Sequence, residues 1–441
     1  MKVSVIPALF LMVLIAHQFV FVNHADARDG YALAQCVECH EEMVDDHALS
    51  VHGSVECLGC HTEAAEEEHE ALAPVDCRKC HAPHDEKVIH DAHTRVTCKA
   101  CHLEGGELSA DPESGSVIWN GMFRPGSVLP PHQSVLSETG ARCGNCHFQG
   151  NIFGASSMIL PAKGFLCLTC HVATFSVSDK ITFVSLCIFL AGMVGLGVVW
   201  FSGTMGNRAY RAGEKTEMST RFEPAAFFYV KRFRLLKVLL LEVFLLQRLF
   251  RLSPVRWFIH ALIFFPFFFR FAFGLTALLL SIFLPGGSLT TAMLDKNHAV
   301  CALFFDVTGL MVLAGSAAAI FRLGNDPAEM VASLPKPGRG MSAMIGLIVL
   351  VGFILEGLRI AMTGWPDGAR WAFLGYAISL SLKGMTGLTD SYGYVWYAHA
   401  ILTGIFIALI PFTRMIHIIT APIVLIINAR RGHPEIIKNE V

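Results

Sequence analysis

The sequence of 441 residues lacks the signatures of several large protein classes. It contains no glycine-rich nucleotide loop, no flavin motif, no zinc-hydrolase motif and no constellation that would activate a nucleophile. These absences exclude the common nucleotide-dependent and hydrolytic enzymes, and no feature indicates nucleic-acid binding. Disulfide and iron–sulfur cysteines are missing too. Of 14 cysteines, only Cys187 and Cys301 lie outside six regular motifs, and both sit in apolar runs.

Those six motifs are copies of Cys-x-x-Cys-His. The spacing is typical of covalent haem c attachment, in which two thiols bind the vinyl groups of one porphyrin and the next histidine binds the iron. Zinc ribbons or a disulfide framework are the alternatives, but neither needs a histidine after every pair. The predicted attachment residues are Cys36, Cys39, Cys57, Cys60, Cys77, Cys80, Cys98, Cys101, Cys143, Cys146, Cys167 and Cys170. The predicted proximal ligands are His40, His61, His81, His102, His147 and His171.

Each haem also needs a ligand on its second face. Seven further histidines occur in the same part of the chain, which favours bis-histidine haems that transfer electrons. The alternative, a terminal reductase with an open haem iron, would need one iron without a distal ligand. His52 and His93 each stand five positions before the first cysteine of a motif, a recurrent placement of distal ligands, but the remaining assignment stays open. The distal candidates are His47, His52, His69, His84, His90, His93 and His132.

Charge divides the chain into two parts. Residues 28–178 contain 21 acidic and 9 basic residues, whereas the residues that follow contain 14 acidic and 24 basic ones. Haem c is attached outside the cytoplasm, so the chain needs an export signal. An apolar run from Val3 to Val22 after Lys2, with small residues at Ala25-Asp26-Ala27, predicts one, and an uncleaved anchor is the alternative. The predicted organisation is a signal peptide (1–27), a periplasmic hexahaem c domain (28–178), a first transmembrane helix with a cytoplasmic amphipathic linker (179–256), a transmembrane dihaem b domain (257–430) and a cytoplasmic tail (431–441).

Five apolar runs are each near the ~20 residues that cross a bilayer. Lysine and arginine are concentrated in the loops that a five-span topology places in the cytoplasm, in agreement with the positive-inside rule. We therefore expect a mainly α protein: an irregular multihaem c domain, with short helices packed on haems, plus a five-helix transmembrane bundle. The predicted spans are 181–201, 258–284, 299–321, 344–361 and 395–418, and the interrupted run 227–252 is predicted to lie on the membrane surface.

Four histidines lie in or beside these spans, where an imidazole is costly unless it has a function. His399 and His417 are 18 residues apart, which corresponds to five turns and about 27 Å along one helix. The topology places His298 level with His399 on the outer side and His260 level with His417 on the inner side. Two bis-histidine haems b are therefore predicted, with four hydrogen-bonded helix histidines as the alternative.

The residues around these histidines resemble a known family. The segments Ala398-His399-Ala400 and Pro411-Phe412-Thr413-Arg414-Met415-Ile416-His417 resemble the last helix of the gamma subunit of respiratory nitrate reductase, and Arg256-Trp257-Phe258-Ile259-His260 resembles its second helix. The dihaem cytochrome b subunits of heterodisulfide reductase and of the sulfite-reductase-associated membrane complex are similar. The resemblance implies quinol or quinone chemistry at a dihaem b core. One difference is that the gamma subunit has a second histidine on this helix where the chain has Arg270.

Buried ionisable residues are further candidates. Asp306 and Glu356 are predicted to carry quinol protons, with structural ion pairing as the alternative. Arg270 is predicted to neutralise a haem propionate or to pair with one of these carboxylates.

The combined prediction is respiratory electron transfer in the inner membrane. The quinone pool, with menaquinone as the expected quinone, would connect through two haems b to six haems c, most simply by quinol oxidation. The expected partner is a periplasmic cytochrome or reductase, and the chain would be a quinol:cytochrome c-type oxidoreductase or its electron-transfer subunit. The alternative is a subunit of a larger complex that passes electrons between periplasmic cytochromes and a cytoplasmic iron–sulfur partner.

Overall fold

A computed structural model describes residues 41, 47–48, 52–53, 55–61, 77, 93–102, 107–111, 116–120, 143–177, 179–201, 236–284, 287–325 and 339–430. The chain divides into two compact units. The first comprises Met1–Cys77 with Pro125–Ser134, and the second comprises Arg78–Arg124 with Val135–Val441. The second unit therefore contains the last three Cys-x-x-Cys-His motifs together with all the predicted spans. The predicted signal peptide and tail lie outside the described residues.

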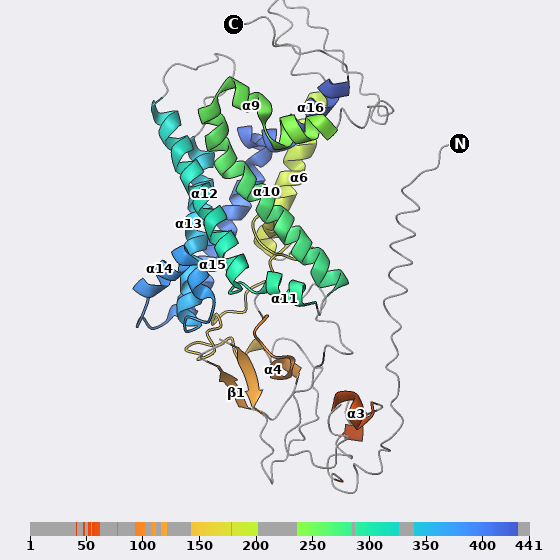
Figure 1. Cartoon of the computed structure of the whole chain (residues 1–441), viewed down its shortest axis with the longest axis vertical. Coiled ribbons are helices and arrows are strands. Elements are labelled where there is room, and N and C mark those ends of the chain that lie inside the picture. The colour runs from red at the N-terminus through yellow and green to blue at the C-terminus, as the bar shows by residue number, and fades with distance from the viewer. Residues whose placement is uncertain are drawn as a thin grey trace, which may run out of the picture. The chain divides into compact units, whose positions relative to one another are not determined.

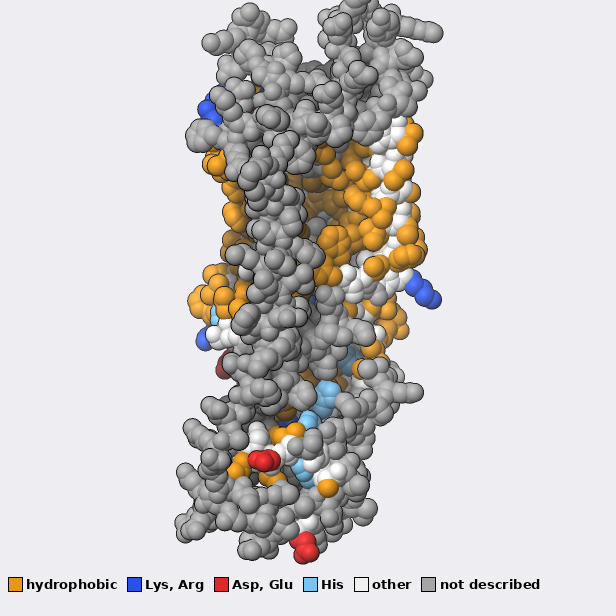
Figure 2. Space-filling view, turned by 90° about the vertical axis from the view of Figure 1, so that its right-hand side faces the viewer, with side chains coloured by type: hydrophobic (Ala, Val, Ile, Leu, Met, Phe, Trp, Pro, Cys, Tyr) orange, Lys and Arg blue, Asp and Glu red, His pale blue; other side chains and the backbone are white. Residues whose placement is uncertain are grey.

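The second unit is built on five long helices, α6 (Lys180–Phe201), α10 (Pro254–Phe283), α12 (Ala299–Asn325), α13 (Arg339–Met362) and α15 (Leu388–Leu409). All five are long and apolar enough to cross a membrane, which confirms the predicted mainly α fold with five spans. Figure 2 shows apolar side chains along this helical part. Large residues such as Val194 and Val198 of α6 are exposed there, as expected for a surface that faces lipid. The chain is thus a multi-pass membrane protein.

Close helix packing depends on glycine at two crossings. A Cβ at Gly404 of α15 would lie 2.4 Å from Ser185 Oγ of α6. A Cβ at Gly315 of α12 would lie 2.8 Å from Ile263 Cγ1 of α10. Small residues at helix interfaces let membrane helices approach closely and replace the hydrophobic driving force that lipid removes.

The predicted span 395–418 is not one continuous helix. Helix α15 ends at Leu409, two 3-10 turns follow (η7, Ile410–Phe412, and η8, Arg414–Ile416), and α16 (His417–Arg430) begins at the second histidine. Pro411 lacks an amide donor, so it cannot continue the helical ladder. Thr413 is extended, and its side chain accepts a hydrogen bond from the Met415 amide, which starts the next turn. The expectation that His399 and His417 lie on one helix, five turns apart, is therefore wrong: they lie on α15 and α16.

Several short elements escaped the sequence analysis. Helix α11 (Ser288–Leu294) precedes α12, and the turn η6 (Ala369–Trp371) and α14 (Phe373–Ser381) lie between α13 and α15. The surface run is described from residue 236 onward, as the π-helix η5 (Val238–Phe244) and α9 (Gln247–Leu252). Figure 1 shows α9 and α16 at one end of the bundle and α11 and α14 at the other.

The part of the second unit that precedes α6 contains a β-hairpin where only short helices and irregular chain were expected. Strand β1 (Glu107–Ala110) pairs antiparallel with β2 (Val117–Asn120), and Leu108 lies opposite Trp119. Val96 forms a parallel bridge to Val117, which ties the hairpin to α4 (Cys98–His102) of the fourth motif.

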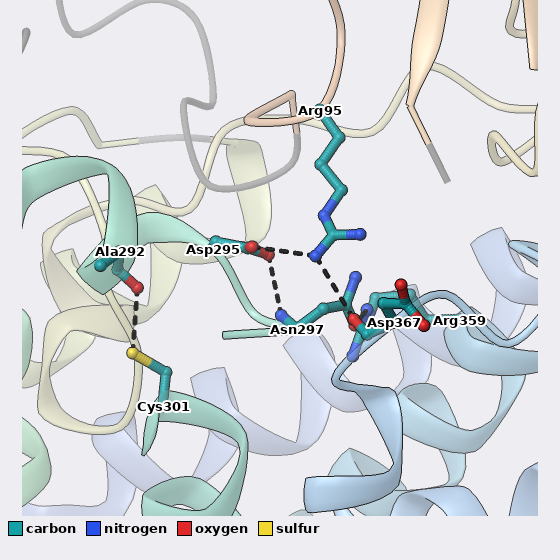
Figure 3. Close-up of polar contacts among 7 residues, drawn as sticks. All are labelled: Arg95, Ala292, Asp295, Asn297, Cys301, Arg359 and Asp367. Atoms are coloured by element: carbon teal, nitrogen blue, oxygen red, sulfur yellow. Dashed lines mark hydrogen bonds and ion pairs between the residues drawn. The ribbon is translucent and has the colours of Figure 1, made fainter. Parts of the chain in front are cut away.

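Arg95 connects this region to the membrane helices (Figure 3). Its guanidinium forms an ion pair of 3.0 Å with Asp295, between α11 and α12, and donates to the carbonyl of Asp367 at 3.5 Å. The amide of Asn297 donates to Asp295 Oδ1 at 2.9 Å, and Arg359 of α13 donates to Asn297 Oδ1 at 2.7 Å. The fourth-motif region is thereby held at the α11 end of the bundle.

Candidate haem sites

The motifs that the structure describes in full fold as single turns. In the motifs that begin at Cys57, Cys143 and Cys167, the histidine amide donates to the carbonyl of the first cysteine, at 2.9, 2.8 and 2.9 Å. One turn places positions i, i+3 and i+4 on the same side of the chain. Two thiols and one imidazole thus face a common space, as attachment to one porphyrin requires. In the first unit the second motif forms α3 (Cys57–Cys60), directly after a turn in which the Val55 amide donates to the His52 carbonyl at 2.8 Å.

Among the described residues of the second unit, three pairs of histidine rings meet. The ring centroids are 6.3 Å apart for His93 and His147, 6.0 Å for His171 and His399, and 6.1 Å for His260 and His417. Two imidazoles that share one metal have centroids about 6 Å apart, because each metal–nitrogen bond is about 2 Å and each ring centre lies about 1 Å behind its nitrogen. All three pairs fit bis-histidine ligation of a haem iron.

The first of these pairs joins the fifth motif to a histidine just before the fourth. His147 Nδ1 lies 2.7 Å from the carbonyl of Ser156. A carbonyl can only accept, so Nδ1 carries the proton and Nε2 is left for a metal, the usual arrangement of a ligating histidine. Asn151 holds the loop in place, because its side chain bonds the carbonyls of Phe148 and Ala155 at 2.8 and 2.9 Å.

The fourth and fifth motifs lie near one another. Burial raises the pKa of the Cys146 thiol, and the neighbouring thiols Cys101 and Cys143 raise it further. Such an effect between Cys101 and Cys146 requires the two motifs to be neighbours in space.

The second pair joins the sixth motif to the membrane helices, and we call His171 and His399 the junction pair. The motif lies on η2 (Phe165–Thr169) against α10. A Cβ at Gly274 of α10 would lie 2.7 Å from the His171 carbonyl oxygen, so only glycine permits this approach. Leu168 is 1% exposed and packs with Ala173 and with Leu278 of α10.

The surroundings of the junction pair are positively charged. Burial lowers the pKa of His171 well below its ordinary range, and the charges of Lys163, Arg270 and Lys296 lower it further. A neutral imidazole is the form that binds a metal. Arg270 itself is buried; it donates to Thr308 Oγ1 at 2.8 Å and to the carbonyl of Phe305.

The third pair lies within the membrane helices. His260 stands two turns inside α10, whose start is defined by Ser253, which accepts from the Arg256 amide, and by Pro254. His417 opens α16, and its Nδ1 lies 2.7 Å from the Arg414 carbonyl. As in the fifth motif, this bond leaves Nε2 for a metal. The predicted inner pair is therefore brought together.

The predicted outer pair, His298 with His399, is not brought together. His298, just before α12, is exposed, and among the described residues the imidazole ring beside His399 is that of His171. Sequence reasoning did not connect His171 to the membrane, although one signal was available: only eight residues separate it from the start of α6 at Lys180.

The two carboxylates lie side by side near α14. Asp306 is fully buried, and its Oδ2 accepts from the Leu374 amide at 2.6 Å, so it holds the first turn of α14. Glu356 lies next to Asp306 and against Gly375, where a Cβ would lie 2.8 Å from Oε2. Several other predicted site residues lie outside the described residues, namely Cys36, Cys39, His40, His69, Cys80, His81, His84, His90 and His132.

The paired histidines on membrane helices are typical of membrane-bound cytochromes, and comparison with known proteins agrees with that class. Residues 266–431 match the family described as nitrate reductase gamma subunit. This part of the chain contains most of α10 together with α12, α13 and α15. It is similar to a cytochrome b-type membrane electron-transfer subunit, a class that implies haem b. The match leaves all six Cys-x-x-Cys-His motifs and His260 outside it.

A similar protein is one of the subunits of the dihydromethanophenazine:CoB--CoM heterodisulfide reductase of Methanosarcina mazei. It is 24% identical over 269 residues, which cover 56% of this chain and 90% of the relative. No solved structure matches the chain.

Proposed function

We propose that this chain transfers electrons between a membrane quinone and redox partners outside the membrane. In the simplest case it oxidises quinol and passes the electrons to those partners. One observation carries the proposal: paired histidines occur within the membrane helices, at their α11 end and in the haem c region beyond. Haem iron, when bound at these pairs, supplies reversible one-electron chemistry.

The chain's own residues would act as ligands, spacers and charges. His260 and His417 would hold a haem b, and the six motifs would hold haems c. The buried Arg270, with Lys163 and Lys296, would balance the negative propionates. Asp306 and Glu356 are our candidates for moving the protons of a quinol, because they are adjacent and buried beside α14.

We place the α11 end of the bundle and the haem c region on the periplasmic side of the inner membrane. The loops at the opposite end carry most lysines and arginines, and the positive-inside rule assigns those loops to the cytoplasm. We expect menaquinone as the quinone and a periplasmic cytochrome or reductase as the outer partner.

A second candidate function is favoured by the relative named as a heterodisulfide reductase subunit. In that case the chain would be one subunit of a complex and would exchange electrons with a cytoplasmic iron–sulfur partner at its basic face. Purification under mild conditions distinguishes the two, because a stoichiometric iron–sulfur protein would co-purify only in the second.

The proposed function is tested by rapid mixing of the purified protein with a menaquinol analogue. The b-type α-band should rise before the c-type α-band, because the apolar compartment that admits a quinol contains His260 and His417. In the double variant His260→Ala/His417→Ala the c-type band should then rise far more slowly. Rapid c-type reduction in that variant would contradict the proposal.

A further inference from the structure

The junction pair combines a histidine of a haem c motif with a histidine of a membrane helix. We propose that the haem c attached to Cys167 and Cys170 lies at the α11 end of the bundle, with His171 and His399 as its two axial ligands. It occupies the place where the sequence predicts a second haem b. This inference rests on the proposed haem c attachment, but it is independent of the quinone chemistry.

The first support is the spacing of the rings. Their centroids are 6.0 Å apart, which is nearly the same separation as in the pairs His93–His147 and His260–His417. The distance alone would also fit an ordinary contact between rings. What distinguishes this pair is that His171 directly follows the two thiols that bind a porphyrin.

The second support is that the sixth motif is fixed on the membrane helices. Gly274 admits the His171 carbonyl, and Leu168 is buried in a cluster with Leu278 of the same helix. The preceding segment is also seated on the bundle. A Cβ at Gly154 would lie 2.5 Å from the Met362 carbonyl, and the Ser157 amide donates to the Thr389 carbonyl at 3.1 Å. The porphyrin of this motif therefore cannot lie far from the bundle end.

The third support is that a separate haem b at His399 is excluded. An imidazole nitrogen binds one iron, so His399 cannot serve both this haem c and a separate haem b. The expected alternative partner, His298, is exposed and has no ring contact with His399 among the described residues. Within the described membrane helices, one histidine pair is then left for haem b, His260 with His417.

A buried cation also lies at the junction. Arg270 is buried and donates to Thr308 Oγ1 at 2.8 Å. A haem bound here would bring two propionates as further anionic partners for it. Attachment itself needs no oxidant. Each thiol adds across one vinyl double bond, so that sulfur bonds to one vinyl carbon and the thiol hydrogen to the other, with no leaving group.

The consequence is that the haem bound covalently to the sixth motif would also be coordinated by a helix of the membrane bundle. The protein should carry six haems c and one haem b, rather than six and two. The haem c at the junction would be held partly by a membrane helix.

The first test counts haems in the purified full-length protein. Acid–acetone extraction followed by pyridine haemochrome spectra should give a c-to-b ratio near six. A ratio near three would mean a second extractable haem and would overturn the inference. Absence of any extractable haem would instead contradict the haem b proposed at His260 and His417.

The second test replaces His399. If His399 binds the covalent haem, His399→Ala should keep the c-to-b ratio of the wild type but create one high-spin haem c that binds carbon monoxide. If His399 binds a haem b, the variant should lose an extractable haem, and the inference fails. His298→Ala is the matched control and should change neither readout.

If His399→Ala does not accumulate, His399→Met also shows whether His399 binds a haem c or a haem b. Methionine ligation raises the potential of a haem c. A redox titration followed at the c-type band should therefore show one haem c shifted upward. A shift confined to a b-type band would overturn the inference.

Discussion

At the scale of single residues, main-chain carbonyls fix the orientation and tautomer of two of the proposed ligands, His147 and His417. His147 and His417 each direct Nδ1 at a main-chain carbonyl at 2.7 Å, which fixes the proton on that nitrogen. On each imidazole this contact leaves Nε2 for a metal. Such hydrogen bonds also fix the plane of the ring and raise its basicity as a ligand.

Replacing His417 tests the membrane pair. His417→Ala should remove the extractable haem and abolish the b-type α-band, while the c-type band keeps its wild-type intensity. The reason is that a non-covalent haem with one axial ligand loses most of its attachment. Haemochrome spectra of the purified variant provide the measurement. A b-type band of normal intensity would show that His417 is no ligand.

Replacing His93 tests the pair in the haem c region. His93→Ala should leave all haems attached, because the thioethers remain, and should convert one haem c to a high-spin form that binds carbon monoxide. His93→Met should restore a six-coordinate iron at a higher potential. If carbon monoxide leaves the spectrum of the reduced His93→Ala variant unchanged, the distal ligand of this haem lies elsewhere.

At the scale of elements, α10 serves two sites at different depths. His260 lies near its start and Gly274, beneath the sixth motif, is 14 residues further on, about 21 Å along the axis. Arg270 lies one turn before Gly274. One helix thus carries a proposed ligand of the membrane pair, a buried cation and the surface against which the sixth motif packs.

Gly274→Ala tests this docking. The added Cβ would meet the His171 carbonyl at 2.7 Å, and a backbone atom cannot move aside cheaply. Overpacking typically costs about 1–3 kcal/mol, so the melting temperature should fall and the c-type spectrum should change. Gly195→Ala on α6 is the control, because nothing lies within 4 Å of its Cβ. Equal melting of both variants would refute the close contact.

At the scale of the second unit, a polar network joins the segment before the fourth motif to the bundle. Arg95 reaches Asp295, and Asn297 connects Asp295 to Arg359 of α13 (Figure 3). Both partners of the ion pair are partly exposed, so its stabilisation is small and screened by salt.

A double-mutant cycle measures that contact. Arg95→Ala, Asp295→Ala and the double variant should give a coupling energy of about 0.5–1 kcal/mol that decreases as salt is added. Heat denaturation in detergent at two salt concentrations provides the values. Arg370→Ala, an exposed arginine of the turn η6, should show no coupling to Asp295→Ala. Additive single effects for Arg95 and Asp295 would contradict the ion pair.

The sequence by itself determined which motifs, histidines and membrane spans this protein has. Six motifs and four membrane histidines could be read from spacing that is local in the chain, and five spans could be read from runs of apolar residues, because a bilayer imposes a minimum length. The meeting of His260 with His417 also followed, since both lie at the same depth in the predicted topology.

Only the tertiary structure decided how the other histidines pair. Whether His399 faces His298 or His171 depends on where the sixth motif docks, and that docking depends on one absent Cβ at Gly274 and on the apolar contact of Leu168 with Leu278. The break at Pro411 and Thr413 was likewise hidden within an apolar run. Hydropathy records how deep a residue lies, whereas the choice of partner is made by packing between segments that are far apart in sequence.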